Sequence, residues 1–441
     1  MTSELIALAD NYEVGRITRN RKGKLSLVYN DDWREDSNAY PISLSMPLTA
    51  KEHGHEKIDS FLWGLLPDNQ RILESWARRF RASAGSAFAL IACVGEDCAG
   101  AVQFVTPERL SAVRNGTASE VAWIDEHEIA ERLKRLVVDH AAWRIERDTG
   151  QFSLAGAQPK TAFLFDNDRW GVPSGRVPTT HIFKPPLADY DGHAENEHFC
   201  LRLAAKFGLL VTESRVMRFE DQIAIVVTRY DRIRTADGLK RVHQEDMCQA
   251  NGLRPSLKYQ AEGGPGPVDI IRLIDSYSIN PIEDRQAFVD AVALNWLVGG
   301  SDAHAKNYSV LIGSGGDARL APLYDVASAL PYDNIDQKKL TLAMRIGGEY
   351  RLADIRLREW QKFASELNLN ADELLIRLRH LTESMPDLLS ETRQNLMAEG
   401  LTHNLIDSLA RRLTGRARNC ARILEVGSPT GAPSSSTPSS S

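Results

Sequence analysis

Short runs in which hydrophobic and polar residues alternate mark the N-terminal part of the chain. Residues 23–29 and 101–105 have the alternation typical of strands, whereas residues 72–80 place apolar side chains at helical spacing. These elements predict a small α/β subdomain over residues 1–106.

A polar segment, residues 107–119, is predicted to be a linker. Beyond it, Asp125 and Glu128 have the spacing of a capping box at a helix N-terminus. Hydrophobic residues follow at helical spacing, and they are Ile129, Leu133, Leu136 and Val137. One amphipathic helix is therefore expected directly after the linker.

The chain up to residue 243 is rich in predicted strands. The strand-like segments are residues 161–165, 179–184 and 223–228. One helix interrupts them, because Phe199, Leu203 and Phe207 recur every four residues, and Gly208 follows where a left-handed residue would end the helix. Residues 107–243 are expected to form a β-rich lobe.

After residue 244 the pattern becomes helical. The exception is a predicted hairpin, residues 308–312 and 319–323, which a glycine-rich turn joins. We therefore expect an all-α lobe over residues 244–426, interrupted by this hairpin. Residues 427–441 contain only Ser, Pro, Thr, Gly and Ala, so they are predicted to be a disordered tail.

Composition and charge restrict the class of protein. With 441 residues, two or three packed units are expected, since one core rarely grows beyond roughly 250–300 residues. The 53 Lys and Arg residues against 59 Asp and Glu give a net charge of −6, which argues against a general nucleic-acid coat. The longest apolar run, residues 87–94, is too short to cross a bilayer, and no basic residue precedes Arg16 as in a secretory signal. We expect a cytoplasmic protein, without a membrane span, whose five cysteines are reduced.

The sharpest candidate for chemistry is a loop that follows an apolar helix. Gly299 and Gly300 end this helix, and Asp302 and Asn307 then stand five positions apart. This is the spacing of the protein-kinase catalytic loop, in which Asp accepts the substrate proton and Asn binds magnesium. Asp325, after the predicted hairpin, supplies the second metal-binding carboxylate, since Mg²⁺ prefers hard oxygen ligands.

Three weaker signals precede this loop. Residues 153–160 are small and could cradle phosphates or form a simple turn. Lys184 ends a predicted strand, where it could meet phosphates or merely protect a sheet edge. Glu197 begins the next helix and could pair with Lys184, although acids are common in a first helical turn. The signals occur in the order of a bilobal kinase, which favours an ATP-dependent phosphotransferase.

Three other interpretations remain open. His304 beside Asp302 and Asp325 would suit a metal-dependent phosphohydrolase, but only one such cluster is found. A small-molecule kinase would use the same loop. A corepressor scaffold is the non-enzymatic alternative, in which basic residues near the C-terminus face phosphates. These residues are Arg411, Arg412, Arg416, Arg418 and Arg422.

The chain also resembles a known family, the HipA toxins, which are serine/threonine kinases of bacterial type II toxin-antitoxin modules. The resembling segments are residues 153–160, 181–184, 243–249, 302–307 and 323–325, and, towards the N-terminus, residues 41–48, 65–69 and 100–102. The similarity covers nearly the whole chain except the tail. It implies an α+β, bilobal protein-kinase-like fold with an N-terminal α/β subdomain, a β-rich ATP lobe and an all-α C-terminal lobe.

The resemblance also implies roles for individual residues. Asp302 would be the catalytic base, Asn307 and Asp325 would hold Mg²⁺, and Ser153 would be the autophosphorylated serine. The residues expected to contact ATP are Ala155, Gly156, Ala157, Gln158, Lys160, Lys184, Thr228, Arg229, Tyr230, His304, Lys306, Asn307, Tyr324 and Asp325. Residues 228–230 would form the adenine hinge. Thr228 and Ala303 depart from the usual family motifs, without removing a group on which activity depends.

Partners are implied as well. Family members are neutralised by a small helix-turn-helix antitoxin, HipB, and the complex binds operator DNA, mainly through the antitoxin. The expected substrate is a protein of the translation machinery, with glutamyl-tRNA synthetase as the familiar target. Its phosphorylation would cause growth arrest and persistence.

Overall fold

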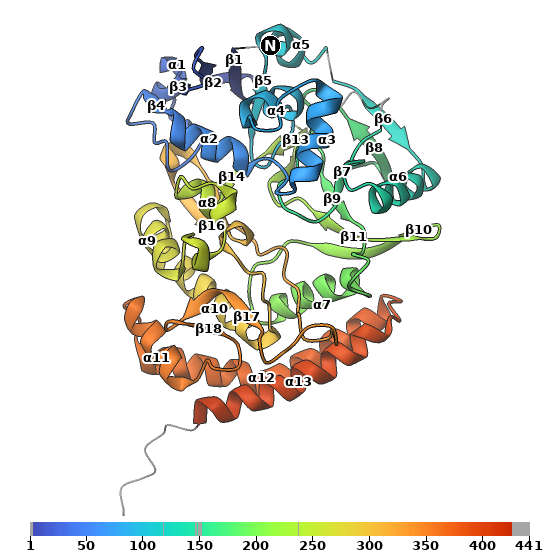
Figure 1. Cartoon of the computed structure of the whole chain (residues 1–441), viewed down its shortest axis with the longest axis vertical. Helices are drawn as coiled ribbons and strands as arrows, with labels where there is room; N and C mark the ends of the chain where they lie inside the picture. The colour runs from blue at the N-terminus through green and yellow to red at the C-terminus, as the bar shows by residue number, and fades with distance from the viewer. Residues whose placement is uncertain (1–2, 118, 146–147, 149–151, 237, 426–441) are drawn as a thin grey trace, which may run out of the picture.

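The computed structural model describes residues 3–117, 119–145, 148, 152–236 and 238–425. The N-terminal subdomain and the C-terminal helices lie at opposite ends of the molecule, and the β-rich lobe lies between them on one side, as the colours in Figure 1 show. The predicted disordered tail, residues 427–441, lies outside the described residues. Among the residues described, no helix has the length and apolar character needed to span a membrane.

The N-terminal subdomain is built on an antiparallel sheet of five strands in the order β4-β3-β2-β1-β5. The strands are β1 (Glu4–Ala9), β2 (Tyr12–Arg19), β3 (Leu25–Tyr29), β4 (Glu52–Gly54) and β5 (Val102–Val105). The helices are α1 (Asp31–Glu35), α2 (His55–Gly64), α3 (Gln70–Phe80) and α4 (Ala87–Val94). The strands predicted at residues 23–29 and 101–105 and the helix predicted at residues 72–80 are present as β3, β5 and α3.

The predicted linker at residues 107–119 is wrong in its first half, which is helix α5 (Pro107–Arg114). Pro107 occupies the first helical turn, where its missing N–H leaves no hydrogen bond unmade. Leu110 and Val113 then lie on one face of the helix and pack against Ile6 and Leu8 of β1. The segment is polar overall, but this pair at helical spacing is enough to attach it to the sheet.

The β-rich lobe contains a sheet of six strands in the order β10-β11-β9-β7-β8-β6. They are β6 (Val121–Ile124), β7 (Thr161–Asp166), β8 (Arg169–Pro173), β9 (His181–Lys184), β10 (Ser214–Phe219) and β11 (Gln222–Thr228). Helix α6 (Glu126–Val138) starts where predicted, because the Asp125 carboxylate accepts a hydrogen bond from the Glu128 N–H at 2.9 Å. Ile129 and Leu133 are buried against the sheet, whereas Val137 is 45% exposed and does not belong to the buried face.

Helix α7 (His193–Lys206) connects the lobes. Phe199 and Leu203, which the periodicity places on its apolar face, are buried in the core of the helical lobe. Gly208, at a φ of 84°, follows the helix end in the left-handed conformation expected of it. A helix within the β-rich lobe therefore packs on the other lobe.

The C-terminal lobe is mainly helical but not all-α. Its helices are α8 (Met247–Ala250), α9 (Pro267–Tyr277), α10 (Pro281–Val298), α11 (Leu357–Glu366), α12 (Ala371–Ala398) and α13 (Asn404–Glu425). Two short strands, β12 (Arg232–Thr235) and β13 (Gly238–Arg241), precede the lobe. The short strands that follow are β14 (His243–Asp246), β15 (Ser309–Ile312), β16 (Ala318–Leu320), β17 (Thr341–Ile346) and β18 (Glu349–Arg351). The predicted hairpin is β15–β16, and the β17–β18 hairpin, which turns through the positive-φ residues Gly347 and Gly348, was not foreseen.

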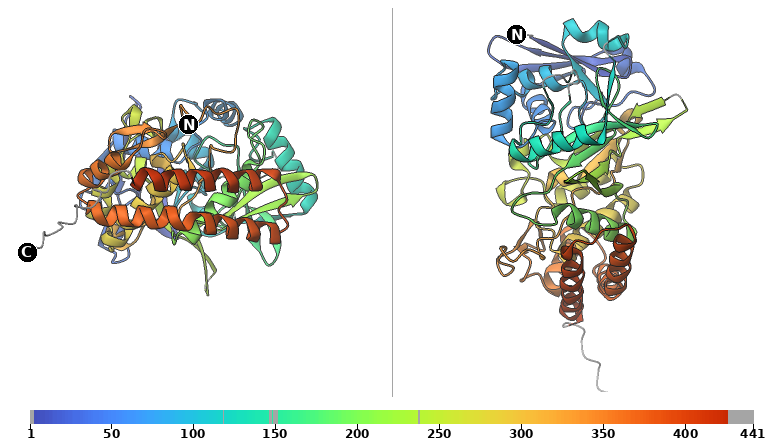
Figure 2. Two further views of the ribbon diagram at one scale, coloured as in Figure 1. Left: turned by 90° about the horizontal axis from the view of Figure 1, so that it is seen from below. Right: turned by 90° about the vertical axis from the view of Figure 1, so that its right-hand side faces the viewer.

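Helices α12 and α13 run side by side as the outer layer of this lobe (Figure 2). They lie at the end of the molecule opposite to the N-terminal sheet. The long helices close the core of the C-terminal lobe and leave its other side, towards the β-rich lobe, for the loop that carries Asp302.

The N-terminal subdomain and the β-rich lobe share one aromatic cluster. Trp76 of α3 lies 4.8 Å from the ring of Trp143, and Trp143 lies 4.3 Å from the ring of Phe152. Because Phe152 directly precedes the predicted phosphate loop, this cluster fixes the start of that loop against the N-terminal subdomain.

A buried ion cluster joins the same two parts. Asp97, which follows α4, accepts hydrogen bonds from Thr179 and from the guanidinium groups of Arg232 and Arg241 at 2.8–3.0 Å. Burial disfavours its charged form, but the nearby arginines outweigh this effect and hold the pKa of the Asp97 carboxyl well below its usual range. The carboxylate is therefore charged and compensated inside the protein.

Asp97→Ala should lower the free energy of unfolding by about 3–5 kcal/mol, because it leaves buried guanidinium groups without their carboxylate. Asp354→Ala is the matched control, since its pair with Arg351 has both side chains about half exposed (49% and 56%). The control should change stability by no more than about 1 kcal/mol. Urea unfolding followed by tryptophan fluorescence measures both, and equal losses would show that the cluster adds nothing to stability.

Candidate active site

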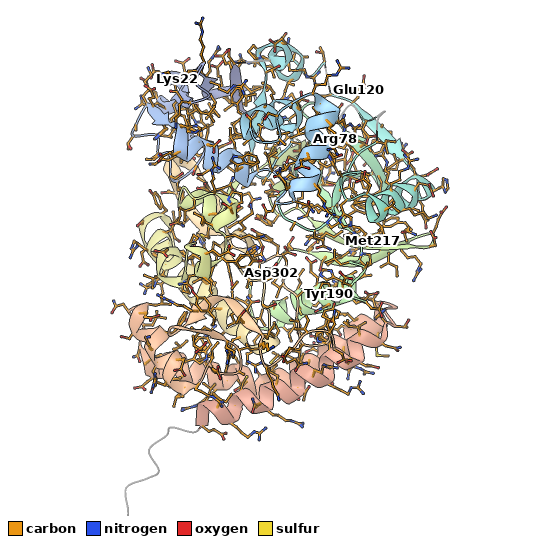
Figure 3. All side chains as sticks on the ribbon, in the orientation of Figure 1. Lys22, Arg78, Glu120, Tyr190, Met217 and Asp302 are labelled. Carbon is orange, nitrogen blue, oxygen red and sulfur yellow. The ribbon has the colours of Figure 1, made fainter. Side chains whose placement is uncertain are left out.

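A cavity of about 700 Å³ opens between the lobes, and all three parts of the chain contribute to its walls. Asp302 lies in the middle of the molecule, on the side of this interlobe region that belongs to the C-terminal lobe (Figure 3). The predicted site residues that line the cavity are Ser153, Ala155, Gly156, Ala157, Gln158, Lys160, Lys184, Thr228, Arg229, Tyr230, Asp302, His304, Lys306, Asn307, Tyr324 and Asp325. Glu197 lies behind this wall, against Lys184.

Lys184 is the central cation of the site. At the end of β9 its ammonium donates to Glu197 of α7 at 2.7 Å and to Asp325 at 2.9 Å. Burial opposes the charge, but Asp325 and Glu197 outweigh it and keep the pKa of Lys184 above its usual range. The same lysine helps to hold the pKa of Asp325 below its usual range, so both groups are charged at neutral pH.

The catalytic-loop candidates are placed by the end of α10. Gly299 adopts a left-handed conformation (φ 68°) and turns the chain out of the helix, so that Asp302 stands in the loop with 68% of its side chain exposed. The Asn307 amide donates to the backbone carbonyl of Asp302 at 2.7 Å. This bond closes the loop and directs the amide oxygen of Asn307 away from that carbonyl.

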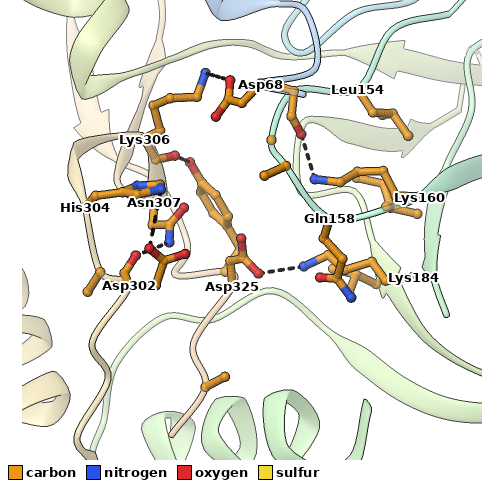
Figure 4. Close-up of a pocket in the computed structure, with 18 of the residues that line it drawn as sticks. Asp68, Leu154, Gln158, Lys160, Lys184, Asp302, His304, Lys306, Asn307 and Asp325 are labelled. Atoms are coloured by element: carbon orange, nitrogen blue, oxygen red, sulfur yellow. Dashed lines mark hydrogen bonds and ion pairs between the residues drawn. The ribbon is translucent and has the colours of Figure 1, made fainter. Parts of the chain in front are cut away.

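Asp325 follows the hairpin in a strained backbone conformation, with a φ of 58°. The preceding Tyr324 anchors it, because the Tyr324 hydroxyl donates to the Lys306 carbonyl at 2.7 Å. Asn307 and Asp325 both face the cavity (Figure 4). Their amide and carboxylate oxygens are of the hard type that Mg²⁺ prefers, so this donor set fits a magnesium ion that shares its remaining ligands with water and phosphate.

The predicted phosphate loop is docked against the N-terminal subdomain. The Ser153 hydroxyl is buried and donates to the Leu65 carbonyl at 2.7 Å, and the Ser153 N–H donates to the Asp97 carbonyl at 3.0 Å. Further along the loop, Gly156 has a φ of 104°, and its carbonyl accepts from the Asp68 N–H at 3.1 Å. The N-terminal subdomain thus holds the loop from both of these points.

Lys160 closes the loop from inside. Its ammonium donates to the Ala155 carbonyl at 2.7 Å, and a Cβ atom at Gly156 would lie 2.5 Å from it (Figure 4). Burial, reinforced by the positive charge of Lys184, lowers the pKa of Lys160 to about 8. This lysine therefore titrates close to neutral pH.

The predicted hinge is only partly available to a ligand. The Thr228 N–H donates to the Glu213 carbonyl at 2.9 Å, and the Thr228 carbonyl accepts from the Thr212 hydroxyl at 2.6 Å. The Arg229 guanidinium is bound to Asp231 in the buried ion cluster. The Arg229 side chain is thus structural, and Tyr230, whose ring stacks 5.8 Å from that of Tyr324, remains on the cavity side.

Lys306, an expected ATP contact, lines the cavity and is paired with two acids. Its buried ammonium lies 3.3 Å from Asp246 and 3.5 Å from Asp68 of the N-terminal subdomain. It is therefore engaged in a link between two parts of the chain. His304 is buried beside Asp302, and burial lowers its pKa, so the imidazole is neutral at physiological pH.

Two residues of this region were missed by the sequence interpretation. The Tyr259 hydroxyl donates to Asp302 Oδ1 at 2.6 Å, and Asp68 pairs with Lys258 at 3.1 Å. Neither lies in a motif around the Asp302 loop. The sequence did contain one signal near Tyr259, because the glycine-rich run at residues 263–266 is typical of a constrained turn.

The fold and the arrangement of charged groups define a bilobal, protein-kinase-like protein with an additional N-terminal subdomain. Comparison with protein families agrees with this description. The model of the HipA-like C-terminal domain matches residues 152–389, and that of the HipA N-terminal domain matches residues 5–105. The chain therefore belongs to the HipA family of kinase toxins.

Individual relatives cover nearly the whole chain. A protein of Sinorhizobium fredii named putative kinase Y4mE is 34% identical, over 93% of this chain and 96% of its own length. The serine/threonine-protein kinase toxin HipA of Shewanella oneidensis is 29% identical over 90% of each chain. A solved complex of HipA, HipB and operator DNA from Shewanella oneidensis MR-1 contains a chain that matches with a TM-score of 0.81 and 25% identity, covering 96% of this chain and 98% of that one.

Binding of an ATP analogue should weaken as the pH rises above about 8, because the phosphates favour the charged form of Lys160, which the free protein loses near that pH. Below pH 8 Lys160 is already protonated, so the affinity should be nearly constant there. Titration calorimetry from pH 6.5 to 9.5 measures this dependence. Lys160→Met should flatten the slope above pH 8, whereas Lys22→Met, on the exposed surface, should leave it unchanged. An unchanged slope in Lys160→Met would exclude this lysine as its source.

Proposed function

We propose that this chain is a Mg-ATP-dependent serine/threonine protein kinase and the toxin of a type II toxin-antitoxin module. The observation that carries the proposal is the pairing of Lys184 with both Glu197 and Asp325, in the cavity that also contains the Asp302 loop. Phosphoryl transfer depends mainly on positioning and charge stabilisation, and these residues supply both.

Each residue has a defined task in this proposal. Asp302 accepts the proton of the acceptor hydroxyl, since its exposed carboxylate faces the cavity. Lys184 contacts the α- and β-phosphates, and residues 155–160 cover the phosphates. Asn307 and Asp325 would hold Mg²⁺, which neutralises phosphate charge when it is bound. Tyr230 and the backbone of residues 228–229 border the adenine site.

The partners are proposed from the relatives. The matching solved complex contains HipB and operator DNA, which supports a HipB-like helix-turn-helix antitoxin for this chain and DNA contact mainly through it. The proposed substrate is a protein of the translation machinery, with glutamyl-tRNA synthetase as the first candidate, and the proposed outcome is growth arrest and persistence.

Two alternatives have less support. A small-molecule kinase would share the catalytic loop, and it would transfer phosphate to sugars or antibiotics instead of proteins. In a corepressor scaffold the C-terminal arginines would face DNA, but Arg416 donates to the Trp296 carbonyl at 3.0 Å and Arg412 to the Leu330 carbonyl at 2.9 Å. These two arginines therefore stabilise the C-terminal lobe.

Asp302→Asn should reduce phosphoryl transfer by about 10²–10⁴-fold, because the amide cannot accept the proton. The test is incubation with labelled ATP, Mg²⁺ and a cell extract, followed by identification of the labelled protein. Melting temperature should not change, since the carboxylate is 68% exposed. Asp354→Asn, at a distant exposed position, is the control. Full transfer by Asp302→Asn would refute the assigned base, and labelling of small molecules alone would favour the alternative kinase.

Ser153→Ala should keep substrate phosphorylation and lose the main self-phosphorylation. The serine hydroxyl is buried against Leu65, so a phosphoryl group of about −1.5 to −2 charges cannot occupy its docked position. Its addition should therefore keep the phosphate loop out of the site and stop the kinase. Mass spectrometry of protein incubated with ATP locates the phosphate, and a main phosphosite elsewhere in Ser153→Ala and wild type would contradict this assignment.

A further inference from the structure

The segment between α8 and α9 contacts both the N-terminal subdomain and the catalytic loop. We name residues 254–262 the bridge segment. On one side, Arg254 pairs with Asp59 of α2, and Lys258 pairs with Asp68 at 3.1 Å. Both acids belong to the N-terminal subdomain, so the bridge segment is fixed to it by two ion pairs.

On its other side the bridge segment contacts the loop that presents the proposed base. The Tyr259 hydroxyl donates to Asp302 Oδ1 at 2.6 Å, and the Ala305 N–H donates to the Lys258 carbonyl at 3.1 Å. The Tyr259 ring also packs edge-on against His304, with ring centroids 5.1 Å apart. Three contacts of different kinds therefore place Tyr259 against this loop.

A glycine-rich turn at residues 263–266 also fixes the position of Tyr259. The Gly264 N–H donates to the Tyr259 carbonyl at 3.0 Å, and a Cβ atom at Gly264 would lie 1.9 Å from the Leu257 carbonyl oxygen. A Cβ at Gly266 would lie 2.0 Å from the Gln260 side chain, which accepts a hydrogen bond from the Arg345 N–H at 2.9 Å. At Gly264 the neighbour is backbone, so the chain can fold back this tightly only because this position lacks a side chain.

We propose that Tyr259 is a positioning residue that holds one oxygen of the Asp302 carboxylate and leaves Oδ2 to face the acceptor hydroxyl. The inference rests on the proposed function, since it takes Asp302 as the base. In the transfer step the acceptor O–H bond breaks, its oxygen bonds to the γ-phosphorus, its proton passes to Asp302 Oδ2, and ADP leaves.

The high exposure of Asp302 makes a hydrogen-bonding partner for its carboxylate necessary. With 68% of its side chain exposed, Asp302 has few packing contacts that would select one rotamer. The phenol is the better held partner, since its ring packs on His304 and the Tyr259 carbonyl accepts from the Gly264 N–H. Burial and the neighbouring carboxylate raise the pKa of Tyr259, so it stays a hydrogen-bond donor at neutral pH. The N-terminal subdomain thus reaches the base through Asp68, Lys258 and Tyr259.

Tyr259→Phe should lower kcat about tenfold and leave the KM for ATP and the melting temperature unchanged, because it removes one hydrogen bond to a charged group and keeps the ring. Tyr277→Phe is the matched control, since among the described residues that hydroxyl donates to the Leu44 carbonyl, at 3.4 Å, and Tyr277 does not line the cavity. Its kcat should equal that of the wild type.

A double-variant cycle separates positioning from a general structural effect. In the Asp302→Asn background, Tyr259→Phe should cause no further loss, because the group that it positions no longer acts as a base. A wild-type kcat for Tyr259→Phe, or a loss of the same size in both backgrounds, would overturn the inference while leaving the kinase proposal intact. Full activity of Asp302→Asn would instead overturn the kinase proposal itself.

Discussion

The structure depends on the buried charge of Lys184. A lysine taken out of water is strongly disfavoured unless carboxylates compensate it, and the two that do so come from different places. Glu197 belongs to α7, and Asp325 follows the hairpin of the C-terminal lobe. Since Lys184 itself ends β9, its ion pairs require the sheet, the connecting helix and the second lobe to meet at one point. The cavity between the lobes lies at this point, and Lys184 and Asp325 line it.

The N-terminal subdomain adds a second constraint to this arrangement. It holds the phosphate loop through the Leu65 and Asp97 carbonyls, and Asp97 also neutralises arginines next to the hinge. It further reaches the catalytic loop, because Lys306 lies between Asp68 and Asp246. The subdomain therefore contributes to the geometry of both the predicted phosphate loop and the loop that carries Asp302. A change in the docking of this subdomain would therefore shift both residues 153–160 and the loop that carries Asp302.

Local spacing explains which parts of the site were predictable. Asp302 and Asn307 belong to one loop, and the amide of Asn307 closes that loop onto the Asp302 backbone, so their separation in sequence carries their geometry. Lys184, Glu197 and Asp325 could be singled out as candidates because they occur along the chain in the order of the corresponding kinase elements. The additional contacts of Lys306 with Asp68 and of Arg229 with Asp97 could not be predicted from local spacing, because these acids are far away in sequence. The helix α5 was hidden in a polar segment, since two apolar residues are enough to dock it.

The docked phosphate loop has a further physical consequence. Ser153 is a structural contact of the loop, with 1% of its surface exposed, so a phosphoryl donor can reach it only after the loop has left the N-terminal subdomain. Return of the loop would then bury a dianion against a carbonyl oxygen, which has no proton to donate to it. Because the Ser153 hydroxyl is part of the docked contact, phosphorylation of this serine is incompatible with the docked state. Under the proposed function, phosphorylation of Ser153 would therefore release the loop without a separate regulatory domain, because the modified hydroxyl is itself one of the loop's contacts.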